Sequence, residues 1–99
     1  MKFLLYAFFS GMFLFNAFPH LVQGICGISH MTPFGISSSP AVNVIWAWCN
    51  LLAGGLLLKL SAPDKWPPRS WAAFCLGGFI ISLFLAIFWS NPDARLPWQ

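Results

Sequence analysis

The stretch that decides the fold is residues 41–60, AVNVIWAWCNLLAGGLLLKL, in which Lys59 is the only charged residue. Two similar runs, residues 3–22 and 71–89, flank it and carry no charge. Each run is about 20 residues long, and at ~1.5 Å per helical residue that length spans the ~30 Å hydrocarbon core of a bilayer. Backbone groups inside lipid must bond within their own segment, so helices are expected. The sequence therefore predicts an all-α integral membrane protein, with one domain over residues 1–99 and three transmembrane helices.

The composition excludes several classes of protein. Apolar residues make up 59% of the chain and charged residues 7%, whereas a soluble domain carries roughly 25% charged residues. The mean hydropathy is +0.74. The net charge of +3 rests on five cations, no two of them adjacent, and these are too dispersed to follow a phosphate backbone. We therefore expect the lipid bilayer as the main partner, and no nucleic acid.

Proline and capping residues mark the expected helix ends. Ser39 and Pro40 suit the start of the second helix, and Ser70 suits the start of the third. Pro19 lies inside the first run. Because proline removes a backbone donor, it predicts either a kinked or a shortened first helix. Between the expected helices lie an inner loop over residues 61–70 and an outer loop over residues 24–40.

The outer loop is expected to be ordered. It has no charged residue, and its Thr32-Pro33-Phe34-Gly35 segment is typical of a tight turn. Loops longer than about 12 to 15 residues without structure of their own are usually functional or disordered. The turn signal favours a functional or structural role for this loop over disorder.

The charges predict the orientation of the helices. Of the cations, Lys2, Lys59 at the end of the second run, Lys65 and Arg69 lie on the side of the N-terminus and the inner loop, whereas only Arg95 lies on the side of the outer loop and the C-terminus. The positive-inside rule then predicts a cytoplasmic N-terminus and an external C-terminus. A bacterial inner membrane is the expected location.

A cleaved signal peptide is the alternative interpretation of the first run. Lys2 and the apolar residues after it resemble a short positive region followed by an apolar core. No small-residue cleavage site follows, because the next residues are NAFPH, from Asn16 to His20. We therefore expect the segment to be retained. Its removal would leave a two-helix protein.

Small residues recur at helical spacing and predict close helix packing. Residues four or three positions apart lie on one helix face, and small side chains there let backbones approach each other. The expected packing residues are Ala7 and Gly11 on the first helix, Ala47 and Gly54 on the second, and Gly78, Ser82 and Ala86 on the third. These stripes favour either a compact three-helix packing or self-association.

Polar side chains on the first two helices and in the outer loop form the candidate site, and all but Asn50 lie in the expected outer half. Asn16, His20 and Gln23 share one face of the first helix, and Asn43 and Asn50 share the small-residue face of the second. With His30 of the outer loop, the candidate polar cluster is Asn16, His20, Gln23, His30, Asn43 and Asn50. Such groups are costly in lipid unless they bond across helices. A structural role is the simplest interpretation.

No metal, cofactor or catalytic set is predicted. His20, Cys26 and His30 could each ligate a metal, but their spacing matches no standard motif and no fourth ligand or supporting carboxylate is evident. A cofactor cannot be assigned. The sequence also lacks a nucleophile with its base, a phosphate-binding loop and paired carboxylates, so an enzyme is not favoured.

Three functions remain open from the sequence. The first is an accessory or structural subunit of a larger membrane complex, for which other membrane helices would be the partners. The second is a homo-oligomeric channel or transporter of a small solute, lined by the amide stripes and impaired by Asn50→Leu. The third is a protein that binds a cofactor, metal or lipid at its outer face, through His20, His30 and the Thr32–Gly35 turn.

Overall fold

The computed structural model describes residues 1–99 and is mostly helical. Three long helices follow one another along the chain: α1 (Lys2–Ile25), α2 (Pro40–Leu60) and α3 (Pro68–Ser90). A two-stranded hairpin, β1 (His30–Thr32) and β2 (Gly35–Ser38), joins α1 to α2, and a short 3₁₀ helix, η1 (Pro63–Lys65), precedes α3. All three long helices are long and apolar enough to cross a membrane.

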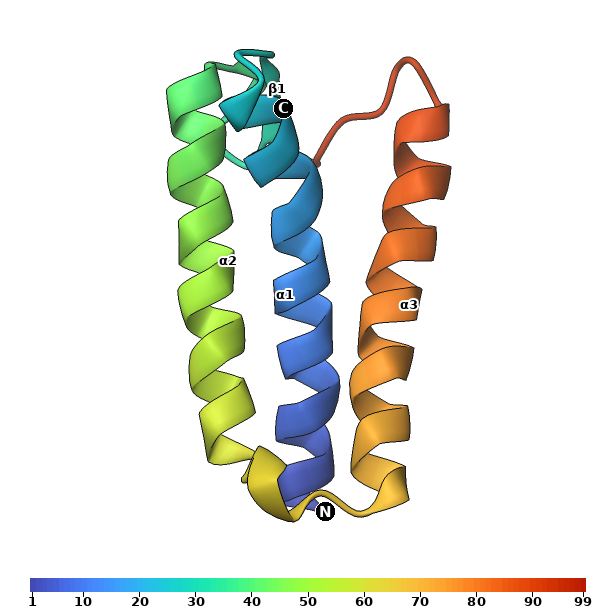
Figure 1. The fold of residues 1–99 in the computed structure, drawn as a ribbon. Coiled ribbons are helices and arrows are strands. Elements are labelled where there is room, and N and C mark those ends of the chain that lie inside the picture. The colour runs from blue at the N-terminus through green and yellow to red at the C-terminus, as the bar shows by residue number, and fades with distance from the viewer.

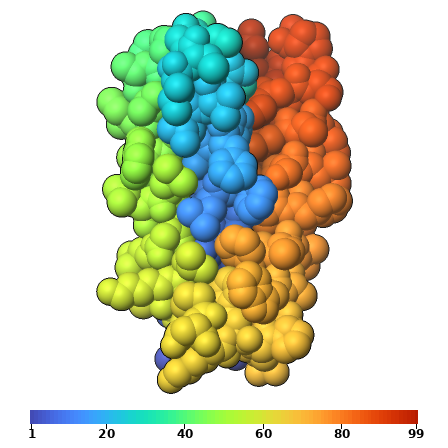
Figure 2. All heavy atoms as spheres, viewed as in Figure 1, coloured from blue at the N-terminus to red at the C-terminus, as the bar shows by residue number.

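Helix α1 is the centre of the arrangement. It runs between α2 and α3 and packs against both of them (Figure 1). Helices α2 and α3 make at most marginal contact with each other. On the face drawn in Figure 2, part of α1 is visible between them. The fold is therefore two helix pairs that share α1, and not a closed three-helix bundle.

The helices are slightly longer than the apolar runs that predicted them. Helix α1 continues through Pro19 to Ile25, so the alternative in which the first helix is shortened at this proline is wrong. Helix α2 begins at Pro40, directly after its N-cap Ser39, whose side chain accepts a hydrogen bond from the backbone N–H of Val42. Helix α3 begins at Pro68, two residues before the expected cap Ser70, because proline at the first position needs no backbone donor.

The loop after α1 is a compact β-hairpin. Strands β1 and β2 pair antiparallel, with His30 opposite Ser38 and Thr32 opposite Gly35. The turn between them contains Phe34, whose backbone N–H donates to Oγ1 of Thr32 at 3.1 Å. The loop expected to be ordered is thus held by its own hydrogen bonds.

Glycines set the distance between α1 and its two neighbours. A Cβ atom added at Gly77 of α3 would overlap the carbonyl oxygen of Phe8 in α1, and one added at Gly11 would overlap the carbonyl oxygen of Phe74. On the other side of α1, Gly54 of α2 packs against Leu14. Only a residue without a side chain lets the backbones come this close.

The expected packing residues divide into two groups. Five of them are buried: Ala7, Gly11, Ala47, Gly54 and Gly78. Ser82 and Ala86 are exposed and line a groove between α1 and α3, beside Phe15 and Phe18. The two phenylalanine side chains occupy the space next to this part of α3, so the close contact made by Gly77 and Gly78 does not extend along the rest of the helix.

The C-terminal tail returns to the hairpin. Nε1 of Trp98 donates to the carbonyl oxygen of Pro33 at 2.8 Å, and Nε2 of Gln99 donates to the carbonyl oxygen of Thr32 at 2.7 Å. These two bonds join segments more than sixty residues apart in the chain. The tail and the hairpin therefore form one layer at the end of the molecule opposite Met1 (Figure 1).

Candidate functional site

Asn43 connects three parts of the fold through one side chain. Its Oδ1 lies 2.9 Å from Nδ1 of His20 on α1. Its Nδ2 donates to three backbone carbonyl oxygens, those of His30 at 2.9 Å, Ser38 at 3.1 Å and Ser39 at 3.0 Å. Asn43 and His20 are both buried. A buried amide is stable only when its polar atoms are paired, and here both of them are.

A second amide pair lies further along the same helices. Nδ2 of Asn16 on α1 donates to Oδ1 of Asn50 on α2 at 3.0 Å. Nδ2 of Asn50 in turn donates to the carbonyl oxygen of Trp46 at 2.9 Å. The amides that the sequence placed on separate helices therefore bond to each other, which fastens α1 to α2 at a second level.

Two aromatic rings join the hairpin to α3. The ring centroids of His30 and Trp89 lie 4.2 Å apart, and those of His30 and His20 lie 5.4 Å apart. Nε2 of His30 and Nε1 of Trp89 are buried without a hydrogen-bond partner. Burial lowers the pKa of the His30 imidazole, and the nearby His20 lowers it further by charge repulsion. His30 therefore favours the neutral form in the fold.

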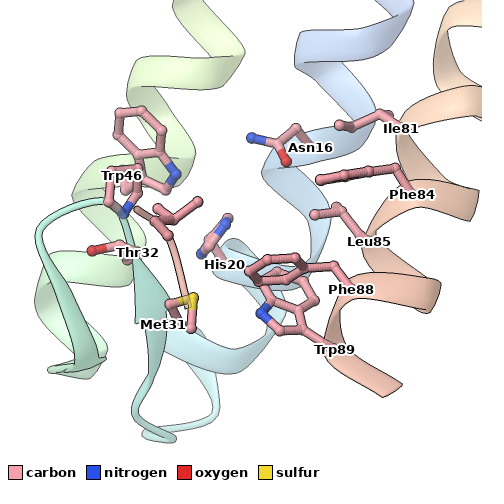
Figure 3. Close-up of a pocket in the computed structure, with 12 residues that line it drawn as sticks. Asn16, His20, Met31, Thr32, Trp46, Ile81, Phe84, Leu85, Phe88 and Trp89 are labelled. Atoms are coloured by element: carbon pink, nitrogen blue, oxygen red, sulfur yellow. The ribbon is translucent and has the colours of Figure 1, made fainter. Parts of the chain in front are cut away.

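These side chains border a cavity of about 170 Å³ between α2 and α3. Asn16 and His20 of α1 lie at its floor, with Trp46 of α2 on one side and the apolar side chains of α3 on the other (Figure 3). The α3 wall consists of Ile81, Phe84, Leu85, Phe88 and Trp89. Met31, Thr32 and Pro33 of the hairpin and Leu96 of the tail complete the lining. The cavity is thus apolar apart from a few polar groups, as small-molecule sites usually are.

The structure brings five of the six predicted polar residues together. Asn16 bonds to Asn50, and Asn43 bonds to His20 and to the backbone of His30. The two groups meet at the cavity, which Asn16 and His20 both line. Gln23 is half-buried, does not line the cavity, and accepts a hydrogen bond from Ile28 only through its backbone carbonyl.

The three residues considered as metal ligands do not gather at one point. Cys26 is exposed, whereas His20 is buried and His30 packs against Trp89. No group of three histidine, cysteine or acidic side chains lies close enough to hold a metal ion. The chemistry that this arrangement supports is hydrogen bonding to a ligand in an apolar cavity.

The sequence pattern missed two residues of the cavity. Trp89, the last residue of the third apolar run, packs against both histidines. Trp46 lies three positions after Asn43 and four before Asn50, so the helical period already places it on their face. The period of α3 gives no such signal for Trp89, because that helix is apolar on all sides.

Comparison of the chain with models of known protein families, with curated proteins and with solved structures finds no match.

Proposed function

We propose that this chain is an integral membrane protein in which α1, α2 and α3 all cross the bilayer. Their lengths support this. At ~1.5 Å per residue, helices of 21 to 24 residues are longer than the ~30 Å thickness of the hydrocarbon core. Large apolar side chains cover the outer faces of α2 and α3, among them Leu52, Phe79 and Ile87. Such a surface is stable in contact with lipid and costly in contact with water. The protein should stay in the pellet when membranes are washed with alkaline carbonate, and release into the supernatant would contradict the proposal.

The proposed orientation has the N-terminus in the cytoplasm. Met1 lies beside Lys65 and Arg69 at one end of the fold, and the hairpin lies at the other end (Figure 1). A membrane-impermeant maleimide should label the exposed Cys26 in intact spheroplasts. A cysteine introduced as Asp64→Cys, in a Cys26→Ala background, should be labelled only after lysis. The opposite pattern would reverse the orientation.

Within the membrane, the protein binds an amphipathic small molecule in the cavity. One observation carries this part of the proposal: the polar side chains of Asn16 and His20 open into a mostly apolar cavity, on a helix that α2 and α3 leave partly uncovered (Figure 2). A polar group at lipid depth is costly unless it finds a partner. A ligand with a polar head and an apolar body would supply that partner and would enter between α2 and α3.

Filling the cavity tests the binding function. Leu85 lines the cavity, whereas Leu83 lies nearby on the exposed face of the same helix. Native mass spectrometry of the protein, released in mild detergent from its host membrane, should show a stoichiometric small-molecule adduct. Leu85→Trp should lose the adduct, and the matched variant Leu83→Trp should keep it. Wild-type protein without any adduct, or an adduct that survives Leu85→Trp, would argue against the site.

An accessory role in a larger membrane complex is the second candidate. Ser82 and Ala86 favour it, because they leave a groove of small residues exposed beside Phe15 and Phe18. Small residues of this kind accept a neighbouring helix in lipid. The same mass spectra distinguish the two candidates, since a stoichiometric protein partner would support the accessory role. Loss of that partner in Ala86→Leu, but not in Leu83→Trp, would assign it to the groove.

A further inference from the structure

We infer that the cavity selects a neutral lipid alcohol, whose hydroxyl donates its one hydrogen to an acceptor on His20 or Asn16 while its apolar body lies along α3. The inference rests on the proposed binding function and specifies the ligand of that same site. It follows from the direction of the hydrogen bonds around the cavity floor, which determines whether each polar atom there can donate or accept.

The bond between His20 and Asn43 determines which nitrogen of His20 carries a hydrogen. The Asn43 atom that bonds to three carbonyl oxygens must be the amide nitrogen, because carbonyl oxygens only accept. The other amide atom, which lies 2.9 Å from Nδ1 of His20, is then oxygen and also only accepts. Nδ1 must therefore carry the hydrogen. In a neutral imidazole, Nε2 is left as an unprotonated acceptor.

The neutral form of His20 follows from its surroundings. The chain has only two acidic residues, Asp64 in η1 and Asp93 in the C-terminal tail, and both are exposed. Neither lines the cavity. Burying a charged imidazole without an acidic partner is costly. The lone pair on Nε2 therefore remains available to a ligand.

The bond between Asn16 and Asn50 likewise determines which atom of the Asn16 amide is left free. Nδ2 of Asn50 donates to the carbonyl oxygen of Trp46, so Oδ1 of Asn50 faces Asn16. Asn16 must then use its own Nδ2 in that bond, and its Oδ1 remains without a partner. The only polar side-chain atoms that are fully buried without a partner belong to His30 and Trp89. The unpaired Oδ1 of Asn16 and Nε2 of His20 are therefore accessible. Both residues line the cavity, so both acceptors are open to it.

The lining has three further polar side chains, those of Thr32, Trp46 and Trp89, and the indole N–H of Trp89 is enclosed without a partner. Ser38 donates its hydroxyl hydrogen to the carbonyl oxygen of Gly35, so Thr32 uses its own hydroxyl hydrogen on Ser38. Thr32 therefore has no donor left for a ligand. Trp46 offers an indole N–H, which makes no hydrogen bond within the fold. A hydroxyl group matches this set, because it donates to one of the acceptors and accepts from an N–H.

Other head groups fit less well. A ketone or an ester has no hydrogen to donate, so it would leave His20 and Asn16 unpaired. An ammonium head could donate, but the cavity holds no carboxylate to balance its charge. The volume of about 170 Å³ is close to that of an apolar cavity that admits one small ring, ~150 Å³. It holds a head group and not a whole lipid, so the remaining chain must leave between α2 and α3.

A pair of photoreactive probes tests the inference on the unmodified protein. The first probe is a long-chain alcohol with a diazirine close to its hydroxyl, and the second is the methyl ether of the same molecule. Both are incorporated into phosphatidylcholine vesicles that contain the protein, and labelling of the α3 residues 81–89 is measured by mass spectrometry. We expect the alcohol to label this segment about tenfold more than the ether, the factor expected from one hydrogen bond.

Two variants connect the preference to the cavity floor. Asn16→Leu removes one acceptor and should lower the ratio of alcohol to ether labelling. Gln23→Leu is the matched control, because Gln23 is half-buried on the same helix and does not line the cavity. It should leave the ratio unchanged. Equal ratios in the two variants would contradict a role for Asn16 in ligand choice.

The outcomes separate the inference from the binding function beneath it. Labelling by both probes to the same extent, abolished by Leu85→Trp and kept in Leu83→Trp, would overturn the alcohol preference and leave the binding site standing. If residues 81–89 are not labelled, or if Leu85→Trp leaves their labelling unchanged, the site itself is overturned. Competition decides the source of the alcohol: octadecanol should displace the probe. Displacement by free glycerol at the same concentration would show that a lipid-borne ligand is wrong.

Discussion

Asn43 and His20 lie 23 positions apart in the chain and meet with Oδ1 and Nδ1 at 2.9 Å. The nitrogen of the same amide bonds to carbonyls at both ends of the hairpin segment, so one side chain holds α1, the hairpin and the start of α2. This contact also determines which nitrogen of His20 carries the hydrogen. The stability of this end of the fold and the chemistry of its cavity therefore depend on the same residue.

Asn43→Ala should destabilise the protein by on the order of 3 kcal/mol, because it leaves His20 and several carbonyl groups unpaired inside the fold. The free energy of unfolding, measured by denaturant titration in detergent micelles, checks this. Asn91→Ala is the control: the Asn91 side chain is exposed and bonds only to the backbone N–H of Asp93. Similar losses in the two variants would contradict the assigned role of Asn43.

Gly77→Ala should weaken the contact between α1 and α3, because the new methyl group would overlap the carbonyl oxygen of Phe8. We expect a loss of about 2 kcal/mol in the free energy of unfolding, typical of overpacking. Gly55→Ala is the matched control, since a Cβ there meets no other atom. It should be neutral or slightly stabilising. A neutral Gly77→Ala would show that α3 does not approach α1 this closely.

Trp98→Phe should loosen the C-terminal tail, because phenylalanine cannot donate to the carbonyl oxygen of Pro33. Limited proteolysis should cut residues 91–99 faster by a factor of about five, which corresponds to one hydrogen bond of ~1 kcal/mol. Trp48→Phe serves as the control, because Trp48 is exposed on α2 and makes no hydrogen bond within the fold. If both variants are cleaved at the wild-type rate, the tail is not held by this bond.

Acid should destabilise the fold through His30. Its pKa is lowered by burial and by the nearby His20, so the unfolded chain binds a proton more readily than the folded chain. The free energy of unfolding should therefore be fully retained above about pH 6.5, the ordinary histidine value, and should fall as the pH decreases below it. His30→Gln should make the dependence between about pH 7 and pH 5 shallower. If the free energy of unfolding of His30→Gln falls with pH as steeply as that of the wild type, another group causes the effect.

Local patterns in the sequence predicted much of the fold. The three apolar runs predicted three long helices, and the Thr32–Gly35 segment predicted a turn that the structure shows as the loop of a hairpin. Residues 43, 47, 50 and 54 were expected on one face of the second helix, and all four are buried there. These features follow from helical period and turn chemistry, which depend on neighbours along the chain.

The candidate site was only partly predictable. The polar residues of α1 and α2 stand out because the residues around them are apolar, so their meeting could be anticipated. The wall formed by α3 could not, because nothing in a uniformly apolar helix indicates which side faces a neighbour. Nor does a sequence pattern show that Trp89 packs on His30, or that the tail returns to the carbonyl of Pro33.

The sequence by itself determined that three long apolar helices form, where they begin and end to within a few residues, and which residues are polar among them. The tertiary structure alone decided that α1 lies between the other two helices, that a cavity opens between α2 and α3, and that His20 and Asn16 present acceptors to it. The physical reason is that helix formation depends on the residues within one segment. The distance between helices depends instead on contacts between segments, such as that of Gly77 with Phe8, and the direction of each hydrogen bond depends on carbonyl groups contributed by distant parts of the chain.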